Sequence, residues 1–362
     1  MNMIARVEGR AELWRQARVA RELGSPFVAA VLEAGHRQLE QAPLTADLIA
    51  GWPGDPSAAA LAMRFNAALH AVARRGSHPY LSALYQGAHE DFDGAIGDVL
   101  AAEDRFIFQW LHHTPQTNEI GRAAALASAL MAVRHNLGMP FELLEVGSSC
   151  GLNLNLGRYA YRLGGVATGD LTSPIRIEPE WRGPAPVHAP IEVLRARGID
   201  LNPLDARDAA TRERLLSFVW ADQPRRARRL EQALGLARAH PPQVERGNAA
   251  DWLGERLREP QDLGVCRVVF HSMVLQYLRP QDREAIIDAV GEAGARATHE
   301  RPLAWISFEW TPARTEVQLL LTCWPSAETH LLARCHAYGD WIEMLEQPKR
   351  LTLATARTCQ PA

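Results

Sequence analysis

Residues 141–163 have the sequence FELLEVGSSCGLNLNLGRYAYRL, and this stretch decides the fold that we expect. FELLEV is a short apolar run between Gly138-Met139-Pro140 and Gly147, which predicts a buried strand that ends in a tight turn. LNLNLGRYAYRL then predicts a helix that runs into a second short strand. A turn that joins a buried strand to a helix is the place where open parallel sheets bind their ligands.

Further apolar runs extend this strand into a sheet. VCRVVF (265–270) and LAWISF (303–308) lack polar alternation, as strands buried on both faces do. VQLLLTCW and HLLARCHAY, separated by a polar turn, predict an antiparallel hairpin. VERGNAADWL predicts a strand and a turn that open a helix. Residues 205–240 have a charged, helical pattern, whereas residues 171–200 are rich in Pro and Gly and are expected to be irregular.

These patterns predict an α/β protein with a mostly parallel sheet and a C-terminal antiparallel hairpin, preceded by a helical N-terminal region. The helical region covers residues 1–138, where we expect four to six helices. The α/β domain covers residues 139–348 and contains an insertion at about 171–243 that is expected to cover the pocket. Residues 349–362 are expected to form a tail.

The composition of the chain limits the classes of function that we expect. The chain has 362 residues and a formal net charge of −3, and 47% of its residues are hydrophobic, as in ordinary globular proteins. The slightly acidic balance argues against a nucleic-acid partner and favours a small-molecule substrate. Lys349 is the only lysine, so lysine-based covalent catalysis is not expected. Five cysteines without a CxxC pair indicate reduced thiols in the cytoplasm, and no apolar stretch is long enough to span a membrane.

The turn Glu145-Val-Gly147-Ser-Ser-Cys-Gly151 admits three interpretations. It matches three of the four fixed positions in the acidic-x-Gly-x-Gly-x-Gly loop of S-adenosylmethionine enzymes, although Ser149 replaces the second glycine and a dinucleotide fingerprint is not met. It also satisfies the G-x-S-x-G elbow of a serine hydrolase, with Ser149 as nucleophile and His271 or His336 as base. The third interpretation is a tight turn that binds no ligand.

The residues of this turn and several other motifs resemble a bacterial family known as domain of unknown function twenty-three thirty-two. The matching segments are EVGSSCGLNL with the following RYAY, TNEIGR (117–122), RGID (197–200), PLD (203–205), VWADQ (219–223), FHS (270–272) and HAYGDW (336–341). The resemblance covers nearly the whole chain. It implies a Rossmann-like, methyltransferase-type sheet behind a helical region, but no established activity. Cys150 and Asn248 stand where the family more often has Ala and Asp.

A bound methyl donor would be held by residues at the carboxyl ends of the strands. The expected cofactor-binding residues are Glu145, Gly147, Ser148, Ser149, Gly151, Asn153, Asn248, Ala249 and Ser272. Backbone N–H groups of Ser148 to Gly151 are expected around the donor. The alternatives are ordinary structural roles: Asn153 as a hydrogen-bonding residue at a helix start and Asn248 as a turn residue.

His271 and Glu309, at the ends of two core strands, are the expected catalytic bases. The alternatives are a buried, hydrogen-bonded histidine and a solvated strand end. Asn118, Glu119, Arg122 and Tyr159 are the expected substrate or pocket residues. A Thr or Asn helix cap with Glu in the first turn also explains Thr117-Asn118-Glu119. Cys323, His330, Cys335 and His336 do not have the spacing of a common zinc site, so no metal is expected. Arg225, Arg226, Arg228 and Arg229 are expected to form a solvated helix face.

The leading expectation is therefore an S-adenosylmethionine-dependent methyltransferase that acts on a small molecule. Two alternatives stay open: a serine hydrolase that uses Ser149, and a non-catalytic ligand-binding protein of methyltransferase-like fold.

Overall fold

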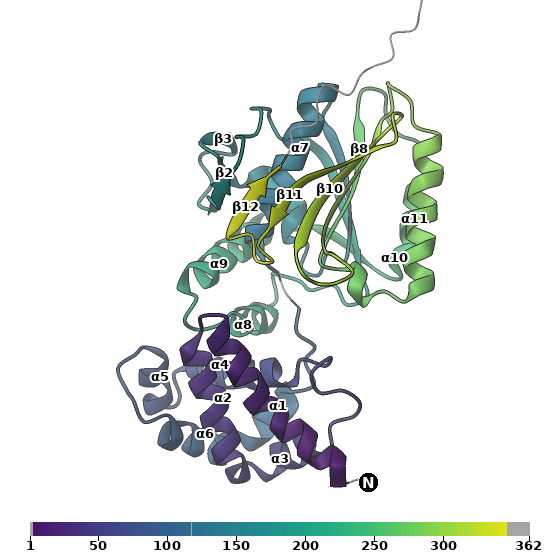
Figure 1. The fold of residues 1–362 in the computed structure, drawn as a ribbon. Coiled ribbons are helices and arrows are strands. Elements are labelled where there is room, and N and C mark those ends of the chain that lie inside the picture. The colour runs from purple at the N-terminus through teal and green to yellow at the C-terminus, as the bar shows by residue number, and fades with distance from the viewer. Residues whose placement is uncertain (1–2, 117, 346–362) are drawn as a thin grey trace, which may run out of the picture. The chain divides into compact units, whose positions relative to one another are not determined.

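The computed structural model describes residues 3–116 and 118–345, which form two compact units (Figure 1). Of the described residues, the helical unit comprises 3–116 and 207–231, and the α/β unit comprises 118–206 and 232–345. The expected tail at 349–362, the end of the expected α/β domain, Thr117 and Lys349 lie outside the described residues. None of the described helices is long and apolar enough to cross a membrane.

The helical unit consists of short helices that begin and end at Pro, Gly or a capping residue. Gly76 ends one helix with a positive φ, and Asp91 caps another by accepting a hydrogen bond from Gly94 N. The elements are α1 Met3–Glu22, α2 Pro26–Gln38, the 3-10 helix η1 Leu39–Gln41, α3 Pro43–Ala50, α4 Leu61–Arg75, α5 Pro79–Tyr85, α6 Phe92–Trp110 and α8 Ala209–Ser217, with α9 Pro224–Ala239 crossing residue 231.

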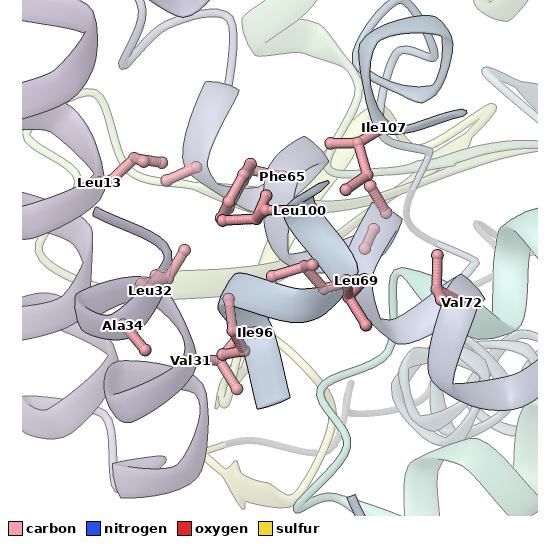
Figure 2. Packing of buried hydrophobic residues seen from close by; sticks show 14 of the residues in the cluster. Leu13, Val31, Leu32, Ala34, Phe65, Leu69, Val72, Ile96, Leu100 and Ile107 are labelled. Atoms are coloured by element: carbon pink, nitrogen blue, oxygen red, sulfur yellow. The ribbon is translucent and has the colours of Figure 1, made fainter. Parts of the chain in front are cut away.

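Apolar side chains from these helices form one fully buried core. Figure 2 shows Leu32 of α2, Phe65 and Leu69 of α4, and Ile96 and Leu100 of α6 gathered in it. Their three- and four-residue spacing is the periodicity that predicts helices. The sequence patterns before residue 138 predicted four to six helices, and this was an underestimate, because the described residues there contain seven α-helices.

VWADQ (219–223) belongs to the helical unit. Ser25 Oγ donates a hydrogen bond to Asp222, and Trp220 Nε1 donates to Met63 Sδ at 3.4 Å. Phe218 and Trp220 pack against the core of this unit. These contacts give the motif a structural role in the helical unit.

The α/β unit is built on a nine-stranded sheet in the order β5-β12-β11-β10-β9-β8-β1-β6-β7. Its strands are β1 Phe141–Val146, β5 Glu180–Arg182, β6 Val193–Asp200, β7 Gln243–Arg246, β8 Cys266–Ser272, β9 Leu303–Trp310, β10 Val317–Trp324, β11 Glu328–Cys335 and β12 Trp341–Met344. β7, β6, β1, β8 and β9 are mutually parallel, and β9, β10, β11 and β12 pair antiparallel. A mixed α/β sheet is therefore confirmed, and so is the C-terminal hairpin.

The other elements of this unit connect or cover the sheet. They are η2 Ile120–Arg122, α7 Ala123–Leu137, η3 Leu152–Arg158, α10 Ala249–Arg256, η4 Leu275–Tyr277 and α11 Pro280–Ala295, with a small sheet of β2 Ala160–Leu163, β3 Val166–Gly169 and β4 Arg176–Ile177. α10 and α11 lie together along the sheet (Figure 1). Leu144 and Val269 of the sheet pack against buried side chains of these two helices, such as Leu253 of α10 and Ile286 of α11.

The structure corrects two details of the expected sheet. Residues 193–200, expected to be irregular and part of an insertion, form β6, which pairs directly with β1. The sequence VLRARGID concealed this strand because Arg195 and Arg197 interrupt its apolar residues. The expected helix in LNLNLGR is the 3-10 helix η3 rather than an α-helix.

Candidate ligand site at the carboxyl ends of the parallel strands

The candidate site lies in the α/β unit, where the parallel strands end. Because β1, β6, β7, β8 and β9 run in the same direction, their carboxyl ends share one edge of the sheet. This edge holds the turn 147–151 after β1, Asp200 at the end of β6, Asn248 after β7, Ser272 at the end of β8 and Glu309 near the end of β9.

The turn 147–151 needs its glycines because it packs closely against the rest of the unit. Gly147 has φ +72°, and a Cβ there would lie 1.9 Å from Val274 Cγ2. Gly151 has φ +69°, and a Cβ there would lie 2.6 Å from Pro242 Cβ. Ser149, between them, has φ +53°, which is uncommon for a residue with a side chain. Close packing within the chain therefore explains the glycines that the sequence assigned to a ligand.

All five N–H groups of this turn donate hydrogen bonds within the unit. The acceptors are Ile199 O for Gly147 and Ser148 (2.9 and 3.0 Å), Asp200 Oδ2 for Ser149 (2.8 Å), Asn118 Oδ1 for Cys150 (3.3 Å) and Ser148 O for Gly151 (2.7 Å). Free N–H donors around a methyl donor were expected here. In this conformation a ligand would instead meet side chains.

Asn118 reaches the turn, as expected of a pocket residue. Its Nδ2 donates to Ser149 Oγ at 3.0 Å, while its Oδ1 accepts from Cys150 N. Glu119 caps the following 3-10 helix, since its Oε1 accepts from Gly121 N at 3.0 Å. The capping alternative had Thr117 or Asn118 as the cap, but the capping residue is Glu119, and Asn118 instead fixes the shape of the turn.

Arg122 joins three segments that the sequence singled out separately. Its Nε donates to Ala337 O at 2.8 Å, and its NH1 lies 3.5 Å from Ser272 Oγ. The turn that contains Ala337 approaches so closely that a Cβ on Gly339 would lie 2.3 Å from the carbonyl carbon of Gly121. TNEIGR, FHS and HAYGDW therefore meet beside the turn after β1.

Glu145 is a buried acid at this edge with few hydrogen-bond donors around its carboxyl group. Its side chain is only 2% exposed, and its Oε1 accepts one hydrogen bond, from Asn153 Nδ2 at 3.0 Å. Within the described residues, Glu145 Oε2 and Asn153 Oδ1 are buried without a hydrogen-bond partner. Burial raises the pKa of Glu145 to about 8; the bond from Asn153 and the nearby Ser148 hydroxyl oppose this rise, and the charge of Asp200 adds to it.

His271 lies on the other face of the sheet. Parallel partners share a face, so His271 shares one with Val146, whereas Glu145 and its partner Phe270 point to the opposite face. Ser272, one residue after His271, points away from it. The expected catalytic and cofactor-binding residues are thus divided between two faces of one sheet edge.

His271 and Glu309 form a tightly held pair. His271 is fully buried, and its Nδ1 lies 2.7 Å from Glu309 Oε1. The same oxygen accepts from Val274 N at 2.8 Å and Leu275 N at 3.2 Å. Burial raises the pKa of Glu309, but the imidazole and the two N–H groups outweigh burial, so the pKa lies below its ordinary value. Within the described residues, His271 Nε2 has no hydrogen-bond partner.

Asn248, Ala249 and Tyr159 have structural contacts. Asn248 caps α10, since its Oδ1 accepts from Ala250 N at 2.8 Å, and Ala249 is the first residue of that helix. Tyr159 is fully buried and donates to Leu152 O, and burial raises the pKa of its phenol. The capping role of Asn248 agrees with the turn-residue alternative.

The sequence missed two residues of this edge. Asp200 was assigned to an irregular stretch, although its position directly after an apolar Ile199 resembles other strand ends. Val274 carries no local signal, because its contact with Gly147 joins residues that are distant in sequence. Within residues 3–116 and 118–345, no group of three or more His, Cys, Asp or Glu side chains is arranged to hold a metal ion.

Comparison with known proteins identifies the family. The pattern of DUF2332, described as "uncharacterized protein conserved in bacteria", matches residues 10–344. Because this match spans most of the chain, the protein belongs to that family. Comparisons with the curated proteins and with the solved structures gave no significant match.

Proposed function

We propose that this chain is an S-adenosylmethionine-dependent methyltransferase that acts on a small molecule. The order of its parallel strands carries the proposal. If the parallel strands β1, β6, β7, β8 and β9 are numbered 1 to 5 along the chain, their order across the sheet, read from β7 to β9, is 3-2-1-4-5. Sheets of this order bind nucleotide cofactors where the order reverses, at the carboxyl ends of the first and fourth strands. That point lies between β1 and β8.

Side chains at this point fit a ligand that donates hydrogen bonds. The buried, unpartnered Asn153 Oδ1 calls for such a donor, because buried polar atoms are normally paired. Asp200 ends the second strand, where this architecture places the acid that binds ribose hydroxyls. Its carboxylate accepts from Ser149 N and Asn202 N and retains further lone pairs.

When bound, S-adenosylmethionine supplies a methyl group on a positively charged sulfur. The work left to the protein is to align the acceptor and exclude water. Val274 packs so closely against Gly147 that no Cβ would fit between them, which leaves little space for water beside the turn. Below a pH of about 8, Glu145 is protonated and can donate a hydrogen bond to the ligand.

A proton acceptor is needed only for an acceptor that must be deprotonated, such as a hydroxyl or amine. If His271 Nδ1–H donates to Glu309, Nε2 keeps the lone pair of a base. This base serves a substrate that reaches the α10–α11 face. A substrate on the opposite face would lie near Glu145 and Arg122.

One observation favours a second candidate, a serine hydrolase. Ser149 is the central residue of G-x-S-x-G and has φ +53°, and hydrolase elbows also hold their serine in a strained turn. However, His271 makes its hydrogen bond to Glu309 and none through Nε2, so it does not hydrogen-bond to Ser149. Labelling of wild type by a fluorophosphonate probe, lost in Ser149→Ala, would support the hydrolase.

Isothermal titration with S-adenosylmethionine and S-adenosylhomocysteine tests the methyltransferase. We expect saturable binding that Asp200→Asn weakens about tenfold or more, because charge-assisted bonds to ligand hydroxyls are lost while Asn can still accept from Ser149 N. Glu178→Gln, an exposed change in the small-sheet region, is the matched control and should leave binding unchanged. No measurable binding of either ligand at millimolar concentration would refute the proposal.

A further inference from the structure

A cavity in the α/β unit lies toward the other end of the same strands, beside the starts of β1, β6 and β7. Its volume is about 930 Å³, within the range of small-molecule sites. The lining residues come from the start of β1, from η3, from the first part of β6, and from the segments before β7 and after α10: Glu142, Leu154, Asn155, Gly157, Arg158, Ile191, Val193–Arg197, Pro241–Gln243, Glu259, Pro260 and Asp262.

The sequence explains why this region is open. β7 pairs only with Arg197–Asp200, so the outer edge of residues 193–196 has no strand partner among the described residues. Pro241 and Pro242 directly precede β7, and proline has no N–H to donate to a sheet. The prolines therefore prevent β7 from extending along β6 and filling the cavity.

Charged side chains line this cavity in pairs of unequal strength. Glu142 is buried, and its Oε2 accepts from Arg267 Nε at 2.8 Å. Arg195 NH2 lies 2.7 Å from Asp262 Oδ2, but both side chains are about half exposed or more. Exposed pairs contribute little free energy. The Arg195–Asp262 pair can therefore be exchanged for a ligand at small cost.

Positive charge is in excess around the cavity. Arg267, outside the lining, already neutralises Glu142, and Arg256 binds Glu259 in addition to the bond from Arg197. Arg195 and Arg197 also lie 3.7 and 3.6 Å from Glu142 Oε1, so Glu142, Glu259 and Asp262 are shared among the lining residues Arg158, Arg195 and Arg197 together with Arg256 and Arg267. Arg197 Nε is also a buried donor without an acceptor among the described residues.

We propose that this cavity binds an anionic small molecule through a phosphate or carboxylate group held by Arg195 and Arg197, in exchange for Asp262. The planar guanidinium group suits both anions, because it donates two parallel hydrogen bonds. The free edge of β6, the two prolines and η3 surround the arginines, and the space between them accommodates the rest of the ligand. This site does not depend on the proposed methyltransferase activity, since it lies at the opposite end of the strands.

Isothermal titration at constant ionic strength tests the proposal, with inorganic pyrophosphate and citrate as the two probes. We expect saturable binding of at least one probe, and which of them binds tells phosphate from carboxylate recognition. Arg195→Gln should weaken this binding about tenfold or more. Asp262→Asn should tighten it several-fold, because the competing carboxylate is removed. Arg162→Gln, an exposed arginine paired with Glu178, is the control and should have no effect.

Arg195 and Asp262 are exposed enough that both variants should remain folded, which circular dichroism would check. Opposite changes in affinity for these two variants cannot arise from a general loss of structure. The proposal is overturned if neither probe binds at millimolar concentration. It is also overturned if a probe binds but neither variant changes its affinity, because the anion would then bind elsewhere.

Discussion

Glu145 and Glu309 are two buried acids at one edge of one sheet, and they differ in the donors around them. Glu145 accepts one side-chain amide, and burial raises its pKa to about 8. Glu309 accepts from two backbone N–H groups and contacts His271, and its pKa is lowered. Burial alone raises the pKa of both, so the donors decide which acid is charged. A charged Glu309, whose Oε1 has three hydrogen-bond partners, holds structure, whereas Glu145, with one partner, is suited to a ligand.

Removal of Glu309 should have the largest effect. Glu309→Ala leaves His271 and the N–H groups of Val274 and Leu275 without their acceptor, and we expect unfolding to become easier by about 3–5 kcal/mol. Urea unfolding, followed by hydrogen exchange in β8 and β9, measures this change in the α/β unit. A loss below about 1 kcal/mol would show that the pair does not hold this edge together.

Gly147→Ala should have the next largest effect. The new Cβ meets Val274 and the positive φ disfavours a side chain, so we expect a loss of about 2–4 kcal/mol. Val274→Ala in the same chain should restore part of this loss by removing the steric overlap. If the double variant is no more stable than Gly147→Ala, the Gly147–Val274 contact is not the cause.

Glu145→Gln should change how stability depends on pH. The folded pKa of Glu145 is raised, so its contribution is complete below the ordinary value of about 4.5 and is lost as the pH rises through about 8. The Gln variant should lack this decline and gain on the order of 2 kcal/mol relative to wild type at pH 7–8. Denaturation midpoints from pH 4 to 9 measure it.

Glu309→Gln is the matched comparison for this pH profile. The folded pKa of Glu309 is lowered, so its contribution is present above the ordinary pKa and is lost as the pH falls through the folded value. The two Gln variants should therefore depart from wild type at opposite ends of the pH range. The same pH slope for both would contradict the contrast between the two acids.

Asn153→Ala should have the smallest effect, a loss of about 1 kcal/mol for one hydrogen bond. Because the bond from Asn153 lowers the pKa of Glu145, its removal should raise that pKa further. Carbon NMR titration of the Glu145 carboxyl measures the change. Asn155→Ala, which removes a bond to His240 O instead, should leave the pKa where it is.

Local sequence patterns predict the centre of the fold but not its contacts. FELLEV predicts β1 with its observed bounds, because a short apolar run between a Pro and a Gly leaves few alternatives, and all six residues are buried in the structure. β6 escapes detection because Arg195 and Arg197, which border the anion cavity, break its apolar run. Gly147 was expected to make room for a ligand, yet it packs against Val274. Such a contact between residues distant in sequence cannot be predicted from a local sequence pattern.

The most direct test of the central claim is hydrogen exchange of the wild-type chain with and without S-adenosylhomocysteine. A ligand at the reversal point of the strand order should slow exchange in residues 145–153 and 198–202, and it should leave residues 193–196 unchanged. Unchanged exchange in residues 145–153 at saturating ligand, or slowing only elsewhere, would contradict the claim that the carboxyl end of β1 binds the methyl donor.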